Sequence, residues 1–128
     1  MATKRVLKPA KAAPAVGPYN QAVRIGDLLF CAGQIPIDPR NPAGPLPEGI
    51  QAQATRVLEN IKLILEDQGL GFANVVKSTV FMVNLGDFAA MNEVYAKYFT
   101  ADHPARSTIQ VAALPRGAQV EIEVIAHY

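Results

Sequence analysis

The chain has 128 residues, a length suited to a domain with a core of its own, and we expect residues 1–128 to form a single domain. A net charge of +1 gives no basic surplus for nucleic acid or an anionic membrane, and no stretch approaches the roughly 20 apolar residues of a membrane span. One cysteine and two distant histidines offer neither an internal disulfide nor metal-ligand spacing. We therefore expect a cytoplasmic protein that needs no metal and no cofactor.

The first half of the chain predicts short strands and a long surface loop. A weakly marked strand near residues 5–8 precedes AVRIGDLLFCAG, in which two apolar runs flank the tight-turn signal Gly26-Asp27. The next segment, QIPIDPRNPAGPLPEG, contains five prolines, which cannot donate to a sheet or sit inside a helix. This segment is predicted to be a loop on the surface.

The second half of the chain predicts two helices separated by a strand. Apolar residues recur at three- and four-residue steps from Ile50 to Leu65, which is typical of an amphipathic helix, and Gly69 can end it. NVVKSTVFMVNL predicts a strand, and Asp87 is placed to cap a second helix. One face of that helix carries Phe88, Met91, Tyr95 and Phe99. RSTIQVA and QVEIEVIAH then predict two strands around a turn.

This order of elements favours the α+β class, with two helices covering one face of a mixed sheet. Strict alternation makes the strand at residues 75–85 apolar on both faces, one with Val75, Phe81, Val83 and Leu85 and the other with Val76, Val80 and Met82. A monomer with helices on one side would expose one of these sets, and only 18% of the residues are charged. Both observations predict an oligomer in which copies of the chain cover the bare face.

Charged side chains in the two C-terminal strands allow two interpretations. Alternation places Arg106 and Thr108 on one face of the first strand, and Glu121 and Glu123 on one face of the second. The sequence does not determine the register that would bring the arginine and the glutamates to the same side. They form either an exposed ion pair worth about 0–1 kcal/mol or a site in which Arg106 binds a carboxylate and a glutamate acts as general base for water.

Four further polar residues are weighed in the same way. Tyr19, between a Gly-Pro turn and a strand, either lines a cleft or is a hydrogen-bonded core tyrosine. Asn92 lies within the second predicted helix, where a solvated asparagine is the simpler interpretation. Cys31 is interpreted as a small buried apolar residue without a neighbouring base, and His103 as a loop residue.

Four ordered blocks of the sequence resemble a known family. GPYNQA, AGQIPIDP, VFMVNLGDFAAMNEVYAKYF and PARSTIQVAALPRGAQVEIEVIA are similar to the RidA (YjgF-type) family of reactive intermediate deaminases, from about residue 16 to residue 126. The resemblance implies a chorismate-mutase-like α+β fold, with a mixed sheet of about six strands and two helices on one face. It also implies a homotrimer with a central barrel and sites in the clefts between subunits.

The same resemblance implies a reaction and assigns residues to it. The reaction is hydrolysis of 2-aminoacrylate/2-iminopropanoate and 2-iminobutanoate to 2-keto acids and ammonia, which detoxifies reactive metabolites. By the family pattern Arg106 grips the substrate carboxylate, Glu121 holds the attacking water, Tyr19 stacks near the substrate, Gly33 offers backbone contacts and Asn92 completes the site. Glu123 is then structural.

The sequence departs from the family pattern at two positions. Thr108 stands where many bacterial members have cysteine, and Ala32 where many have serine; we expect Thr108 to hold a water or a substrate oxygen. One alternative function is a non-catalytic trimer that binds small ligands or protects proteins, although such a module has little use for the base Glu121. The other is an endoribonuclease or translation inhibitor, which the near-neutral charge disfavours.

Overall fold

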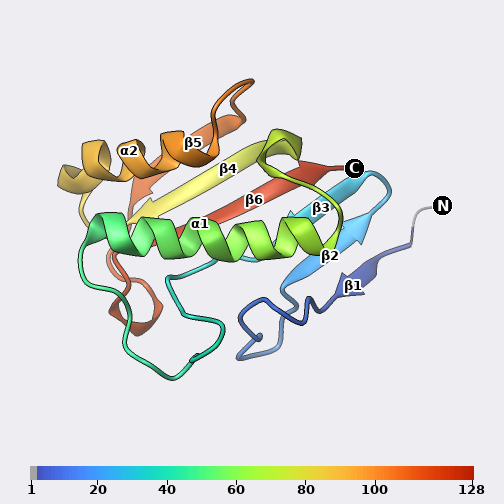
Figure 1. Ribbon diagram of the computed structural model, residues 1–128, viewed down its shortest axis with the longest axis horizontal. Coiled ribbons are helices and arrows are strands. Elements are labelled where there is room, and N and C mark those ends of the chain that lie inside the picture. Colours follow the sequence, from blue (N-terminus) through green and yellow to red (C-terminus); the bar gives the residue numbers. More distant parts are fainter. Residues whose placement is uncertain (1–2) are drawn as a thin grey trace.

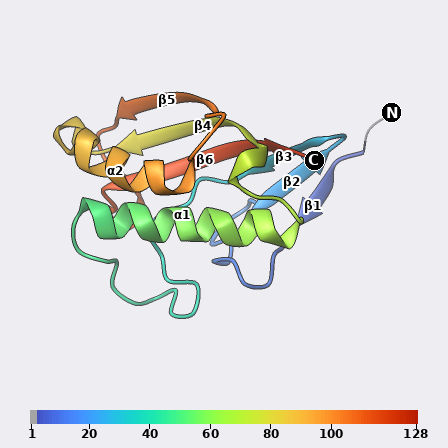
Figure 2. The same ribbon diagram turned by 45° about the horizontal axis from the view of Figure 1, so that its top comes forward.

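A computed structural model describes residues 3–128, and within that range the chain forms a six-stranded sheet and two long helices. Figures 1 and 2 show both helices packed on the same face of the sheet. The elements in chain order are β1 (Arg5–Leu7), β2 (Ala22–Ile25), β3 (Leu28–Cys31), α1 (Ile50–Asp67), β4 (Val75–Met82), α2 (Phe88–Tyr98), β5 (Ala105–Gln110) and β6 (Val120–His127). This arrangement confirms the α+β class, the six strands and the helices on one face.

The strands are arranged in the order β1-β2-β3-β6-β4-β5, and every pair is antiparallel except β4–β5. The predicted C-terminal hairpin is therefore wrong, because β4 lies between β5 and β6. The α2 crossover returns the chain parallel to β4, as parallel neighbours require. Residues 111–119, with a short 3-10 turn at Pro115–Gly117, then carry the chain past β4 to its other side.

The core lies between the sheet and α1. The inward residues of α1 are fully buried, as its spacing predicts: Ala54, Val57, Leu58, Ile61 and Leu65. On β4 the strict alternation predicted from the sequence fails at one point, because the register shifts between Val75 and Lys77. Val75 is consequently buried with Val80 and Met82, whereas Val76 is exposed.

The start of α2 also differs from the prediction. The Asp87 side chain makes no capping hydrogen bond, and a 3-10 turn at Leu85–Asp87 leads into the helix instead. Asn84 caps this turn, since its Oδ1 accepts from the Gly86 N–H at 2.9 Å. Of the predicted apolar face, Met91, Tyr95 and Phe99 are buried, but Phe88 stays partly exposed.

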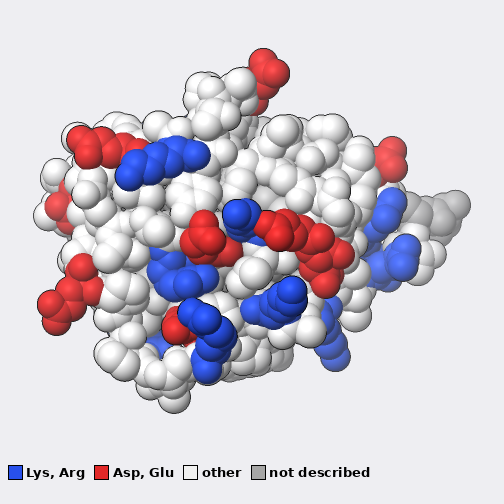
Figure 3. Space-filling view, in the orientation of Figure 1, with Lys and Arg blue, Asp and Glu red and all other residues white. Residues whose placement is uncertain are grey.

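The two faces of the sheet have different surfaces. Over the helix-covered face, acidic and basic side chains lie close to one another (Figure 3). The uncovered face carries apolar side chains, and Phe30 and Ile109 on it remain 42% and 45% exposed. Burial of such a surface by another protein is expected on physical grounds. The apolar pattern of the sequence predicts that copies of the chain cover this face.

Candidate active site

The residues predicted to form the site fall into two groups in the structure. Strand register pairs Arg106 with Ser78, whose own partner on β6 is Val124, and this row lies on the helix-covered face. Glu121 is paired with Phe81, on the uncovered face. Register partners point to the same side of a sheet, so Arg106 and Glu121 lie on opposite faces of one chain. The exposed Arg106–glutamate ion pair considered from the sequence is therefore absent from residues 3–128.

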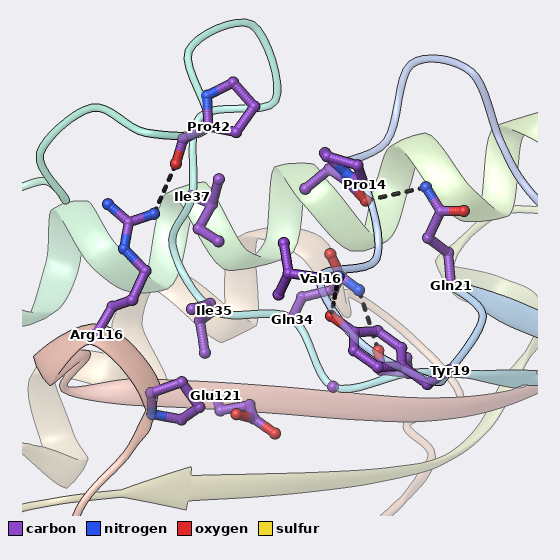
Figure 4. Close-up of a pocket in the computed structure, with 14 residues that line it drawn as sticks. Pro14, Val16, Tyr19, Gln21, Gln34, Ile35, Ile37, Pro42, Arg116 and Glu121 are labelled. Carbon is purple, nitrogen blue, oxygen red and sulfur yellow. Dashed lines mark hydrogen bonds between the residues drawn. The ribbon is translucent and has the colours of Figure 1, made fainter.

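The first group surrounds a pocket of about 480 Å³. Tyr19 and Glu121 border it together with the apolar side chains of Val16, Ile35 and Ile37 (Figure 4). Gly33 and Ala32, which follow β3, also line it. The result is a mostly apolar hollow with one carboxyl group in its wall.

Gly33 is required by the close approach of Glu121. A Cβ at position 33 would clash with the Glu121 carboxyl group and would lie 2.9 Å from its Cδ. Glycine is the residue that permits such an approach between backbone and side chain. The predicted association of Gly33 with the site is thus a direct contact with Glu121.

The Glu121 side chain is partly buried in the wall of this pocket. Burial raises the pKa of Glu121, and the neighbouring Glu123 carboxylate raises it further. Among the hydrogen bonds of residues 3–128, none is donated to its carboxylate. A carboxyl group with a raised pKa and unoccupied oxygens can take a proton from water and return it.

The Tyr19 ring is exposed and is not part of the hydrophobic core. Its side chain is 49% exposed, and its hydroxyl accepts a hydrogen bond from the Val16 N–H at 3.3 Å. The core interpretation of Tyr19 is therefore wrong. The ring instead presents an apolar surface at the edge of the pocket.

The second group is centred on Arg106, in the edge strand β5. Its Nη1 donates to Asn92 Oδ1 at 2.8 Å, and its guanidinium lies over the rings of Tyr95 and Phe88, at 4.7 and 5.4 Å from their centroids. Asn92 is therefore a partner of Arg106 rather than a solvated residue. His103, taken as a loop residue, lines a small hollow with Arg106 and Asn92.

Thr108 belongs to the Arg106 group by register, since its partner on β4 is Val80. Its Oγ1 is buried and makes no hydrogen bond in residues 3–128. A buried hydroxyl without a partner costs free energy unless some group not present in the single chain satisfies it. Thr108 thus has an unused hydroxyl on the same face as Arg106.

Sequence reasoning missed two residues that contact these groups. Arg116 lines the pocket and has a left-handed backbone conformation with φ 58°. Its guanidinium donates hydrogen bonds of 2.6 Å to the carbonyls of Pro42 and Gly44, which hold the proline-rich loop against the pocket wall. Tyr95, which the sequence predicts only as part of one face of the second helix, lies under Arg106. The spacing of Phe88, Asn92 and Tyr95 at three- and four-residue steps is the signal that could have revealed it.

Within residues 3–128, no three histidine, cysteine, aspartate or glutamate side chains lie together as metal ligands would. None of the helices in that range is long and apolar enough to cross a bilayer. Burial raises the pKa of Cys31 to about 12, so its thiol is not a nucleophile near neutral pH.

Known proteins match the chain over almost its whole length. The sequence profile of the family described as Endoribonuclease L-PSP matches residues 10–128. The 2-iminobutanoate/2-iminopropanoate deaminase of Capra hircus is 46% identical over 124 residues, 96% of this chain and 89% of that protein.

Solved structures agree with this match. RidA from an Antarctic Psychrobacter superposes with a TM-score of 0.92 at 44% identity, covering 97% of this chain and 99% of its own. E. coli TdcF with bound serine gives a TM-score of 0.91 at 41% identity, covering 97% and 98%. The chain therefore belongs to the Endoribonuclease L-PSP family, the family of the RidA (YjgF-type) proteins.

Proposed function

We propose that the chain is an enamine/imine deaminase that hydrolyses 2-aminoacrylate/2-iminopropanoate and 2-iminobutanoate to 2-keto acids and ammonia, and so removes reactive metabolites. The observation that carries this proposal is the Glu121 carboxyl group, which has a raised pKa and no protein donor, in the wall of an apolar pocket. Two relatives support it: one is named for this reaction, and TdcF was crystallised with serine, a small α-carboxylate ligand.

The active site of the proposed enzyme is shared between subunits of a homotrimer. One chain holds Arg106 and Glu121 on opposite faces of its sheet, so it cannot present both to one small substrate. In a cyclic trimer, the Arg106 group of one subunit meets the Tyr19, Gly33 and Glu121 group of the next. The same assembly covers the exposed apolar face of the sheet.

In the proposed mechanism Arg106 binds the carboxylate of the protonated imine, and Glu121 takes a proton from water as the water oxygen attacks the carbon of the C=NH2⁺ group. The resulting carbinolamine bears one hydroxyl and one amine. Glu121 returns its proton to nitrogen, the C–N bond breaks, and ammonia leaves as the oxygen lone pair forms the keto group. The hydroxyl proton passes to Glu121 and then to ammonia or solvent, which restores the carboxylate.

The remaining site residues orient the reactants. Tyr19 offers its ring to the planar substrate, and Gly33 leaves room for the Glu121 carboxyl group. The buried Thr108 hydroxyl holds a water or a substrate oxygen, which would satisfy its missing hydrogen bond. Correct placement of water and substrate supplies much of the rate gain, because an imine carbon is already electrophilic.

The test follows keto-acid release from 2-iminobutanoate generated in situ. Glu121→Gln should lower kcat/KM by roughly 10²–10⁴-fold, the usual contribution of a general base, and Arg106→Ala by about 10- to 100-fold. Lys97→Ala, which alters an exposed charge on α2, should leave the rate unchanged. A wild type that does not exceed spontaneous hydrolysis would contradict catalysis and favour a ligand-binding trimer.

RNA cleavage, which the family description suggests, makes a different prediction. Acidic and basic side chains lie together over the helix-covered face, an arrangement that does not favour a phosphate backbone (Figure 3). We expect no cleavage of labelled RNA under conditions that give rapid imine hydrolysis.

A further inference from the structure

Arg106 is held by neutral groups alone. Its contacts are the Asn92 amide oxygen at 2.8 Å and the faces of the Tyr95 and Phe88 rings. Within residues 3–128 no Asp or Glu oxygen pairs with its guanidinium. Neutral partners orient a guanidinium without cancelling its charge, so the charge remains available to an incoming carboxylate.

The Tyr95 ring under Arg106 is itself fixed by a buried hydrogen bond. Its hydroxyl lies 2.7 Å from Ser78 Oγ, and its ring stacks on Phe99 with centroids 4.3 Å apart. The Ser78 side chain is fully buried and Tyr95 is only 6% exposed. Ser78 is also the register partner of Arg106, so both side chains leave the sheet side by side toward α2.

Packing alone does not explain this polar pair. The same face of β4 carries Val80 and Met82, and an apolar residue at position 78 would fill the core without desolvating a hydroxyl. The hydroxyls of Ser78 and Tyr95 satisfy each other and hold one ring in one orientation. The Arg106 guanidinium lies 4.7 Å from the centroid of this ring.

We propose that Ser78 and Tyr95 are positioning residues that hold Arg106 in the orientation in which it binds the substrate carboxylate. The identity of the carboxylate rests on the proposed function. The arrangement itself predicts that loss of the Ser78–Tyr95 hydrogen bond weakens carboxylate binding and leaves the chemical step intact. In kinetic terms, KM rises and kcat stays nearly constant.

The test compares two tyrosines of the same helix. Tyr95→Phe removes the hydroxyl that is hydrogen-bonded to Ser78 at 2.7 Å. Tyr98→Phe removes a hydroxyl that donates to Glu59 Oε2, also at 2.7 Å, and this bond does not involve the groups around Arg106. The readouts are the Kd of 2-oxobutanoate by calorimetry, the steady-state constants for 2-iminobutanoate, and Tm. Tyr95→Phe should lose more thermal stability than Tyr98→Phe, because it leaves the buried Ser78 hydroxyl without a partner, whereas water can reach the partly buried Glu59.

Only the Tyr95 variant should lose carboxylate affinity. Its Kd and KM should rise about three- to tenfold with kcat within about twofold, while Tyr98→Phe stays within about twofold in all three. Ser78→Ala should match Tyr95→Phe, and the double variant should be no worse than either, since both remove the same bond. In an Arg106→Lys background, Tyr95→Phe should have no further effect on Kd.

Several results would overturn the inference. These are equal shifts of Kd in the Tyr95 and Tyr98 variants, additive losses in the double variant, or a fall in kcat at unchanged Kd. A wild type that binds 2-oxobutanoate without hydrolysing the imine contradicts the proposed function only, because the Kd comparison still decides the role of Tyr95. A wild type that does not bind 2-oxobutanoate overturns both.

Discussion

Replacing Gly33 with alanine tests whether the backbone at the pocket positions the Glu121 carboxyl group. The new Cβ would lie 2.9 Å from Glu121 Cδ and 3.2 Å from its Cγ. Carbon atoms normally approach to about 3.5–4.0 Å, so the carboxyl group must move by roughly 1 Å. A displacement of about 1 Å at a reacting group can cost roughly 10²-fold in rate, which is the loss of kcat that we expect.

Stability should not fall in parallel. Gly33 is not in the left-handed region, and the side chain that must move is a partly exposed glutamate rather than packed core. Glycine-to-alanine changes at compatible positions stabilise by about 0.4–1 kcal/mol through the unfolded chain. We therefore expect an unchanged or slightly higher free energy of unfolding in urea, together with the loss of kcat for 2-iminobutanoate.

Gly71→Ala is the matched control, because a Cβ at position 71 would meet no atom within 4 Å and Gly71 does not line the pocket. It should change neither kcat nor stability by much. Full activity of Gly33→Ala would refute the positional argument. So would a loss of activity explained by an equal loss of folded protein.

Three further predictions concern single groups. Glu123→Gln removes the like charge that helps to raise the pKa of Glu121, so the pKa of Glu121 should fall. Because the proposed base is the carboxylate, the variant should keep its activity to lower pH than the wild type in pH profiles of kcat/KM. Identical profiles would show that the two charges are not coupled. With a pKa of about 12 and a buried side chain, Cys31 should resist iodoacetamide in the native protein and react only after unfolding; mass spectrometry showing native labelling with loss of activity would contradict this. Thr108→Val removes a buried hydroxyl that has no partner in residues 3–128. Its free energy of unfolding in urea should equal that of the wild type or exceed it by up to about 1 kcal/mol, while kcat/KM falls. Unchanged kinetics would exclude a substrate contact.

The sequence predicted the parts of the fold that depend on local pattern. The spacing from Ile50 to Leu65 identified α1, and the apolar character of both sides of β4 indicated a sheet with one uncovered face. Pairing between distant segments was not accessible in this way. RSTIQVA and QVEIEVIAH are separated by a short turn region, yet non-local contacts with β4 place that strand between them.

The candidate site was predicted as a set of residues but not as an arrangement. The family resemblance pointed to Arg106 and Glu121. Alternation along each strand could not show whether these two side chains lie on the same face of the sheet, because that depends on how β4 pairs with β5 and β6. Tyr95 was hidden because burial of an aromatic residue on an amphipathic helix explains its presence without any role at a site. Its polar partner Ser78, inside an apolar strand, was the more informative residue.

The proposed division of the site between subunits is tested most directly by mixing two impaired variants. Arg106→Ala and Glu121→Gln would be unfolded together, refolded as a mixture and assayed with 2-iminobutanoate beside each variant refolded alone. In a cyclic trimer with random assembly, about a quarter of the clefts combine an intact Arg106 with an intact Glu121, so the mixture should recover about a quarter of wild-type activity. Activity no higher than that of the separate variants would contradict a shared site and with it the account of how these two residues act together.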